Sequence, residues 1–396
     1  MPETLPNWAD PLVLKKLADR LGTPLFVYSC KDALLRFEHL STALKRTVPV
    51  ASEVMYALKA NANAEIVHSL AQRGASFEVG THEELSFCLS IGVPPERIHF
   101  SNPVTRQSLH LASQINGLRL SAQNRWQIPE IASTRCHQLG VRIAPKIGLS
   151  NYRALRMEAA SADQERKPLG LSEYEISESS ELSLLGDRFS FVHQHVGSRW
   201  GFAQLDQFLA CCRDLADVAE HLISVGFSNI DSINIGGGMD PQMNDTALGG
   251  FCDALAIGLK KSLESRKFLR QITLEPGRFI TGPSGVLLLR VCGTQSYREV
   301  VDVFVDGGYY LISEGVRYGW ENSVALCSNE QRPLVTCRVN GDVAESIDVL
   351  ASGITLPSPQ AGDILAILNA GAYASSELAT FHLRRRPQEY VFPPEP

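Results

Sequence analysis

The feature that most constrains the fold is a regular alternation of short apolar runs and longer amphipathic segments between residues 33 and 282. The runs have the length of strands, and the segments between them show the apolar spacing of helices. Eight such units predict a parallel (β/α)8 barrel. The expected strands are residues 53–58, 76–79, 98–101, 118–121, 141–147, 189–196, 232–235 and 271–275. The alternative is an open, doubly wound sheet, which is disfavoured because no GxGxxG motif follows the first strand.

The pattern changes near Gly282, where closely spaced β-type runs with Gly and Pro turns replace the alternation. This composition predicts a mostly antiparallel β domain, to which residues 23–28 add a strand. We therefore expect a barrel domain over residues 33–282 and a β domain made of residues 1–32 plus 283–396. Residues 149–187 interrupt the barrel rhythm and predict a long loop with a short helix.

Composition excludes several classes of protein. A formal charge of -6 over 396 residues argues against a nucleic-acid surface. The N-terminus lacks the pattern of a signal peptide, and no apolar run approaches the ~18 residues of a membrane span. The nine cysteines show no CxxC spacing, so neither a disulfide framework nor a zinc motif is expected. We expect a reduced, cytoplasmic protein that binds neither nucleic acid nor membrane.

The chemically distinctive residues gather where the predicted strands end, which is where parallel barrels carry their active sites. They are Lys59, Glu78, His195, the glycines Gly236, Gly237 and Gly238, and Glu275. A partly desolvated Lys59 is able to form a Schiff base with a carbonyl, although a lysine that extends from a strand end to water is the plainer interpretation.

The other strand-end residues also have two interpretations each. The three glycines suit either a plain turn or a phosphate cradle made of backbone N–H groups. Glu275 pairs either with Arg278 or with a protonated ring nitrogen, and His195 is either structural or stacked on a flat cofactor. His193 and His195 form an HxH pair, but no third metal ligand shares their motif. Taken together, these parts predict pyridoxal phosphate chemistry and no metal.

The motifs resemble those of the barrel-type pyridoxal-phosphate decarboxylases, which include the ornithine, arginine and diaminopimelate decarboxylases. The matching motifs are YALKAN at 56–61, HVGS at 195–198, GGG at 236–238, EPGR at 275–278 and GAY at 371–373. The resemblance implies a barrel followed by a β domain and a head-to-tail homodimer with shared active sites. It also implies α-decarboxylation of an amino-acid substrate.

By motif, the resemblance implies roles for individual residues. Lys59 corresponds to the Schiff-base lysine, His195 to the residue stacked on the pyridine ring, and Glu275 to the partner of the ring nitrogen. Glu78 occupies the place of an acidic residue near the cofactor. The residues that correspond to phosphate binders are Ser198, Gly236, Gly237, Gly238, Gly277, Arg278 and Tyr373.

Two departures from the family lie in the C-terminal half. Ala344 replaces a cysteine tied to protonation of the product, while Glu345 keeps the adjacent acid that meets the distal amine of the substrate. Glu314 occupies, by an ungapped count, the position of an arginine that binds the far carboxylate of diaminopimelate, and Arg317 and Tyr318 follow it. A carboxylate there repels that group. The sequence therefore predicts a substrate other than meso-diaminopimelate, for example a decorated diamino acid of a siderophore, polyamine or other secondary pathway.

Three alternatives remain open at this stage. Without the usual cysteine, decarboxylation is able to end in a carbonyl product instead of an amine. An amino-acid racemase on the related barrel is disfavoured, because racemases of that type place an arginine opposite the pyridine nitrogen where this chain has Glu275. A non-catalytic regulatory homologue is disfavoured because Lys59 and the phosphate motifs are retained.

Overall fold

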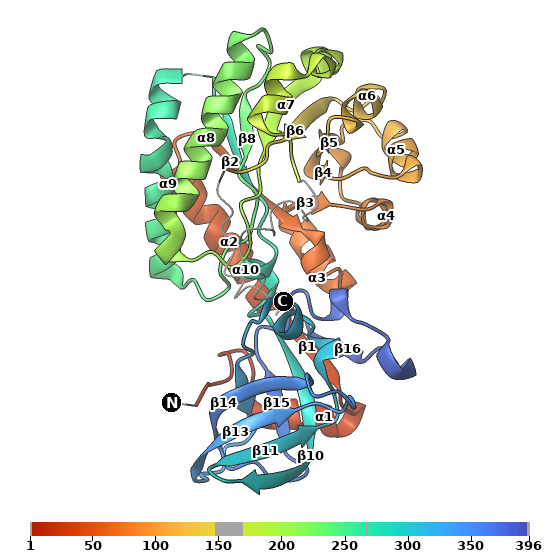
Figure 1. The fold of residues 1–396 in the computed structure, drawn as a ribbon, viewed down its shortest axis with the longest axis vertical. Coiled ribbons are helices and arrows are strands. Elements are labelled where there is room, and N and C mark those ends of the chain that lie inside the picture. Colours follow the sequence, from red (N-terminus) through yellow and green to blue (C-terminus); the bar gives the residue numbers. More distant parts are fainter. Residues whose placement is uncertain (1, 147–168, 267, 394–396) are drawn as a thin grey trace. The chain divides into compact units, whose positions relative to one another are not determined.

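The fold is that of a computed structural model, which describes residues 2–146, 169–266 and 268–393 (Figure 1). The chain divides into two compact units. One unit is built from both ends of the chain, Met1–Ala33 and Ile280–Pro396, and the other from the described residues between Leu34 and Phe279.

The middle unit is a closed barrel of eight parallel strands, so the predicted fold class is confirmed and the open sheet is wrong. Each strand pairs with the next one along the chain, and β9 pairs back with β2, with Val54 opposite Leu274. The strands are β2 (Ala51–Ala57), β3 (Ser76–Val79), β4 (Ile98–Phe100), β5 (Arg119–Ala122), β6 (Gln138–Arg142), β7 (Phe189–His193), β8 (Ser232–Asn234) and β9 (Gln271–Leu274).

Helices surround the barrel and begin soon after the strands (Figure 1). The side chain of Asn63 accepts the Glu65 N–H at 3.1 Å, and that of Thr81 accepts the Glu84 N–H at 3.2 Å. These N-caps start helices α3 and α4 within a few residues of β2 and β3, which keeps the connecting turns short. The helices are α2 (Cys30–Thr47), α3 (Ala64–Gln72), α4 (His82–Ser90), α5 (Arg106–Ser113), α6 (Gln127–Ala132), α7 (Glu173–Glu178), α8 (Leu205–Ser224) and α9 (Asp245–Arg266).

The largest boundary error concerns the strand expected at 141–147. The observed β6 begins earlier and ends at Arg142, after which Ile143 makes only an isolated bridge with Leu171. The apolar run therefore extends past the end of the ladder, and Pro145, which has no N–H to donate, follows it. Of the loop expected at 149–187, residues up to 168 lie outside the described residues, and α7 is the short helix found in the rest.

The unit built from the chain ends is a sheet in the order β12-β15-β10-β11-β13-β14, with β1 paired to both β10 and β16. The expected strand at 23–28 is confirmed as β1, which runs antiparallel to β10. Two pairs, β1 with β16 and β11 with β13, are parallel, so the sheet is mixed. The strands are β1 (Leu25–Ser29), β10 (Gly285–Tyr297), β11 (Val300–Val305), β12 (Val324–Leu326), β13 (Leu334–Asn340), β14 (Val349–Pro357), β15 (Ile364–Ile367) and β16 (Gln388–Phe392).

The core of this unit forms between the sheet and α1 (Pro11–Leu21). The Asp10 side chain caps α1 by accepting the Leu12 and Val13 N–H groups, each at 2.9 Å. This start directs Leu14 and Leu17 into the cluster against the strand residues. Two short helices, α10 (Arg278–Thr281) and α11 (Glu314–Tyr318), complete the secondary structure used below. Among the described helices, none combines the length and the apolar character that crossing a membrane requires.

Candidate active site

The barrel brings the predicted strand-end residues to one end, because the strands are parallel and closed on themselves. Lys59 lies in a single 3-10 turn, Leu58–Ala60, that directly follows β2. Glu78 lies within β3, and Glu275 is the residue after β9. The glycine run begins two residues after β8, and His195 lies two residues after β7.

Lys59 and Glu78 form an ion pair at the end of neighbouring strands. The Glu78 side chain is buried, and its Oε1 accepts the Ser101 hydroxyl at 2.5 Å. The Lys59 side chain is 49% exposed, so burial at the strand end is less than the sequence indicates. The amine is therefore positioned by a fixed carboxylate and stays accessible from the barrel mouth.

Glu275 is held inside the barrel by side chains from two other strands. Its Oε1 lies 2.9 Å from His99 Nδ1 and accepts the Asn234 side-chain N–H at 2.7 Å. Burial alone raises the pKa of the Glu275 carboxyl, but contacts from His193 and His99 outweigh it and hold that pKa well below its usual value. Glu275 is therefore an anion in an enclosed place, which suits it as the partner of a protonated ring nitrogen.

His193 and Arg142 lie close to this carboxylate. His193 Nε2 is 3.2 Å from Glu275 Oε2, but without hydrogen-bond geometry, and neither ring nitrogen has a hydrogen-bond partner within the described residues. Burial lowers the pKa of His193, and the Glu275 carboxylate acts against this to raise it. Burial also lowers the pKa of Arg142, against which Glu275 and Glu78 act to raise it. Arg142 supplies positive charge between the two carboxylates.

His195 faces the glycine loop. Its Nδ1 accepts the Gly237 N–H at 3.2 Å, which leaves the ring proton on Nε2. The residue keeps some exposed surface, but the protein around its ring lowers its pKa to about 3 by burial, and Arg142 and Lys59 add to this. The imidazole is therefore neutral, and a neutral flat ring suits stacking on a cofactor.

The glycine run approaches the neighbouring backbone too closely for any side chain. A Cβ on Gly237 meets the Glu275 carbonyl oxygen at 2.1 Å, and one on Gly238 meets the Gly197 carbonyl oxygen at 1.8 Å. Gly238 also has a φ of +89°, which L side chains rarely adopt. Ser198, the next residue after Gly197, therefore borders this loop. Loops of this kind present backbone N–H groups to an oxyanion.

Gly277 joins the two halves of the barrel site. A Cβ there meets the Ala60 Cβ at 2.7 Å, and the Ala57 N–H donates to the Pro276 carbonyl at 3.3 Å. The loop that carries Glu275 is thereby packed against the turn that carries Lys59. Arg278 follows at the start of α10 and is 7% exposed.

The other predicted site residues belong to the β unit and are placed there by their own contacts. Glu314 is 5% exposed in α11, where Tyr318 is also found. Arg317 of the same helix is ion-paired with Glu377 and donates to the Tyr318 hydroxyl at 2.9 Å. Glu345 is exposed and accepts the Tyr309 hydroxyl at 2.8 Å. Tyr373 has a φ of +56°.

The barrel residues fit pyridoxal phosphate on three observations. An accessible amine is ion-paired at the mouth, an enclosed anion is available for a ring nitrogen, and the glycine loop is a cradle that any Cβ would fill. Lys59, Glu275, the three glycines and His195 are the residues that would hold the cofactor. This fold and donor set define a barrel-type, cofactor-dependent lyase.

Comparison with known proteins identifies the family. The family model described as pyridoxal-dependent decarboxylase, pyridoxal binding domain, matches residues 35–282, and the chain belongs to this family. It is a pyridoxal-phosphate-dependent amino-acid decarboxylase, and the expected cofactor is thereby confirmed.

Relatives of known name cover almost the whole chain. The diaminopimelate decarboxylase of Methanothermobacter thermautotrophicus is 28% identical over 387 residues, which are 95% of this chain and 88% of the relative. That of Aquifex aeolicus is also 28% identical over 387 residues, covering 96% and 88%. Among solved structures, diaminopimelate decarboxylase of M. jannaschii in complex with L-lysine has a TM-score of 0.83 at 23% identity, covering 96% and 89%. Lysine/ornithine decarboxylase of Vibrio vulnificus with putrescine has a TM-score of 0.79 at 21% identity, covering 98% and 99%.

These relatives correct one prediction. The exclusion of meso-diaminopimelate is wrong as drawn, because curated relatives named diaminopimelate decarboxylase match almost the full chain. The exclusion depended on Glu314 and an ungapped count through a turn-rich stretch. The structure shows Glu314 buried, with the half-exposed guanidinium of Arg317 on the same short helix. The negative charge of Glu314 alone therefore does not determine the net charge that α11 presents to a substrate.

The residues of the barrel interior that escaped the sequence reasoning include His99, Ser121, Asn234, Arg142 and, as a neighbour of Glu275, His193. His99 and Asn234 each lie in a three-residue strand, β4 and β8, and point to the inside of the barrel. The signal was present, because a polar residue at an inward position of an otherwise apolar barrel strand needs an internal partner. What the sequence lacked was the identity of that partner on a strand far along the chain.

Proposed function

We propose that the chain catalyses α-decarboxylation of a diamino acid, and that meso-diaminopimelate is the first substrate to test. The main observation behind this proposal is that one barrel holds two groups of opposite charge. They are the Lys59 amine, which Glu78 holds, and the enclosed carboxylate of Glu275. The names of the relatives support the choice of substrate.

Each barrel residue has a task in this proposal. When bound, pyridoxal phosphate supplies an electron sink for the pair of electrons left on Cα by departing CO2. Lys59 would hold the cofactor through its aldehyde, and Glu78 holds the Lys59 amine and balances its charge. Glu275 would keep a proton on the ring nitrogen of the bound cofactor by a charge-assisted hydrogen bond. His195 would cover the ring, and Ser198, Arg278 and the glycine loop would bind the phosphate.

The test is CO2 release by the cofactor-loaded enzyme from meso-diaminopimelate, lysine, ornithine and arginine, with the product identified by mass spectrometry. Conversion of meso-diaminopimelate to lysine supports the proposal. An amine product also separates it from decarboxylation that ends in a carbonyl, and a chirality assay separates it from racemisation. If the enzyme holds its cofactor but releases CO2 from no diamino acid, the proposal is wrong.

A second candidate substrate is a decorated diamino acid of a siderophore or polyamine pathway. One observation favours it: Arg317 is already ion-paired with Glu377, so a free distal carboxylate has to displace an existing partner. Adding such conjugates to the CO2 assay decides between the two. A preference for a conjugate over meso-diaminopimelate by kcat/KM supports the second candidate.

We also propose a head-to-tail homodimer in which each site takes residues from both protomers. Ala344 and Glu345 support this, because both are exposed on the β unit and are therefore accessible to another chain. Mixing two inactive variants, Lys59→Ala and Glu345→Ala, restores part of the activity only if hybrid sites form. A cytoplasmic location is consistent with nine cysteines that are all free thiols.

A further inference from the structure

His99 is a buried residue that the proposed function leaves without a task. It lies in β4, is 1% exposed, and makes contacts through both ring nitrogens. Nδ1 is 2.9 Å from Glu275 Oε1, and Nε2 is 2.9 Å from Ser121 Oγ. The ring is therefore held between a carboxylate on one side and a hydroxyl on the other.

The partners of His99 decide where its proton lies. Glu275 is an anion and accepts hydrogen bonds only, so Nδ1 carries the proton and donates it. Nε2 shares a second hydrogen bond with the Ser121 hydroxyl at 2.9 Å. Because both nitrogens are committed, the ring is fixed in orientation and donates to Glu275 through Nδ1.

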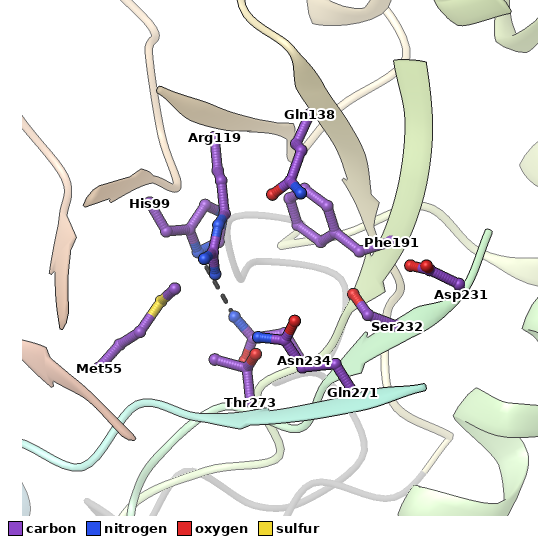
Figure 2. Close-up of a pocket in the computed structure, with 10 residues that line it drawn as sticks. All are labelled: Met55, His99, Arg119, Gln138, Phe191, Asp231, Ser232, Asn234, Gln271 and Thr273. Carbon is purple, nitrogen blue, oxygen red and sulfur yellow. Dashed lines mark hydrogen bonds between the residues drawn. The ribbon is translucent and has the colours of Figure 1, made fainter. Parts of the chain in front are cut away.

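Asn234 acts on the same carboxylate oxygen. Its side-chain N–H donates to Glu275 Oε1 at 2.7 Å, while its Oδ1 accepts the Gly236 N–H at 3.0 Å. Asn234 Nδ2 also lies 3.4 Å from His99 Nδ1, the contact drawn as a dashed line in Figure 2. With the proton of Nδ1 directed to Glu275, this contact is the spacing of two donors on one oxygen. Asn234 thereby ties the carboxylate to the first glycine of the phosphate loop.

The two oxygens of Glu275 therefore differ in their number of hydrogen-bond donors. Oε1 has two donors, whereas Oε2 has only the 3.2 Å approach of His193, which lacks hydrogen-bond geometry, within the described part of the chain. A carboxylate held through one oxygen keeps its other oxygen in a defined place at no further loss of side-chain freedom.

We propose that His99, held by Ser121, and Asn234 are positioning residues that grip Glu275 by Oε1 and leave Oε2 to accept the ring N–H of pyridoxal phosphate. This inference rests on the proposed role of Glu275. It adds that the proton stays on the ring nitrogen because donors from inside the barrel make the carboxylate a poorer base. Without them, the shared proton moves towards Glu275.

The structure offers a way to test this without disturbing the barrel mouth. His99 and Asn234 border a polar cavity of about 90 Å³, which Arg119, Gln138 and Gln271 also line (Figure 2). Gln138, at the start of its strand, is exposed, so the cavity lies near solvent at the end of the barrel opposite the glycine loop. Truncation of His99 to alanine enlarges this cavity and leaves space for a free imidazole.

The electrostatic setting has to be the same in the variants that are compared. The charged or titratable groups around Glu275 are His193, His195, Arg142, Glu78 and Lys59. A suitable pair is His99→Asn and His99→Leu, because both leave these groups in place. Asparagine keeps an N–H donor close to the position of Nδ1, while leucine has a similar size and no donor.

The readout is the nitrogen NMR signal of pyridoxal phosphate labelled with ¹⁵N in its ring, bound to the enzyme, together with the Kd of the cofactor. We expect a protonated-ring signal in wild type and His99→Asn, and a shift towards neutral pyridine in His99→Leu. Loss of a hydrogen bond to a charged group weakens cofactor binding by about tenfold or more. In His99→Ala, added free imidazole returns the nitrogen signal towards that of the protonated ring. Met55→Ala widens the same cavity but removes no donor, so its nitrogen signal stays like that of wild type with and without imidazole.

Two results overturn the inference. One is a folded His99→Leu enzyme that has the wild-type nitrogen signal and a cofactor Kd within about twofold of wild type. A change of about twofold is smaller than the loss of one hydrogen bond to a charged group would cause. The other is equal shifts in His99→Asn and His99→Leu, which assigns His99 to packing. If neither His99→Leu nor His99→Ala folds, Ser121→Ala is compared with wild type, and an unchanged signal there also overturns it. A wild-type enzyme whose bound cofactor has a neutral ring contradicts the role of Glu275 itself, and so the proposed function.

Discussion

Replacing Gly238 by alanine tests whether the glycine loop is the phosphate cradle. The new Cβ lies 1.8 Å from the Gly197 carbonyl oxygen, and the two atoms have to separate to at least 3.0 Å. Because the obstacle is backbone, the loop or the 197–200 segment has to move. A displacement of this size at a binding site costs about a hundredfold in function. We therefore expect Gly238→Ala to bind pyridoxal phosphate about a hundredfold more weakly.

The clash has to be separated from the strain of a positive φ. Gly238 has a φ of +89°, and Gly74, far along the chain in the turn before β3, has a φ of +83° with nothing within 4 Å of its ideal Cβ. Both substitutions carry the left-handed backbone cost of about 1–2 kcal/mol. Gly74→Ala therefore loses that stability and keeps its affinity for the cofactor.

The assay is a fluorescence titration of each cofactor-free protein with pyridoxal phosphate, alongside urea unfolding of the same samples. The expected pattern is a loss of stability in both variants, larger in Gly238→Ala because of the backbone clash, and a loss of affinity in Gly238→Ala alone. If Gly238→Ala binds the cofactor as tightly as Gly74→Ala does, the loop does not hold the phosphate and the reasoning from close approach fails.

Three further predictions concern the rest of the site. Lys59→Ala removes the amine that bonds the cofactor aldehyde, so the visible absorption band of the purified protein disappears; a band that persists contradicts the assignment. His195 has a pKa lowered to about 3 in the folded protein against about 6.5 unfolded, so its neutral form adds stability above about pH 6.5 that is lost as the pH falls towards about 3. His195→Asn therefore flattens the acid side of the unfolding free energy, measured by urea at several pH values. Ala344→Cys introduces the thiol that the resemblance implies at this position, and we expect its product, by mass spectrometry, to contain a larger fraction of amine relative to carbonyl than wild type, or an unchanged fraction if wild type already forms amine alone.

The barrel was predictable because its signal is repeated and local. Each strand is an apolar run followed by an amphipathic helix, so an error at one boundary leaves the others intact. The strand expected at 76–79 is observed as Ser76–Val79, and only the 141–147 and 189–196 strands are displaced by more than two residues at an end. The β unit was less well predicted, since the short strands β12 and β16 carry no repeated pattern and were missed.

The interior of the barrel was not predictable from one sequence. Lys59, Glu78 and Glu275 could be identified from the sequence because they lie at the ends of predicted strands, where a parallel barrel carries its active site. His99 and Asn234 lie inside three-residue strands, and their role comes only from Glu275, which follows another strand and lies 176 and 41 residues further along the chain. Non-local hydrogen bonds leave no spacing in the sequence, so a polar residue in a barrel strand indicates that a partner exists and not which one it is.

The error over the substrate has a related physical origin. Glu314 was treated as an isolated charge at a position counted without gaps, and a substrate responds to the field of all nearby groups. In the structure, α11 carries a buried Glu314 and a half-exposed Arg317 that already contacts Glu377. Reaction type and substrate choice are thus encoded differently in this chain. The first follows from a few strand-end residues fixed by the barrel, whereas the second cannot be derived from the charge of Glu314 alone, because Arg317 on the same helix carries the opposite charge.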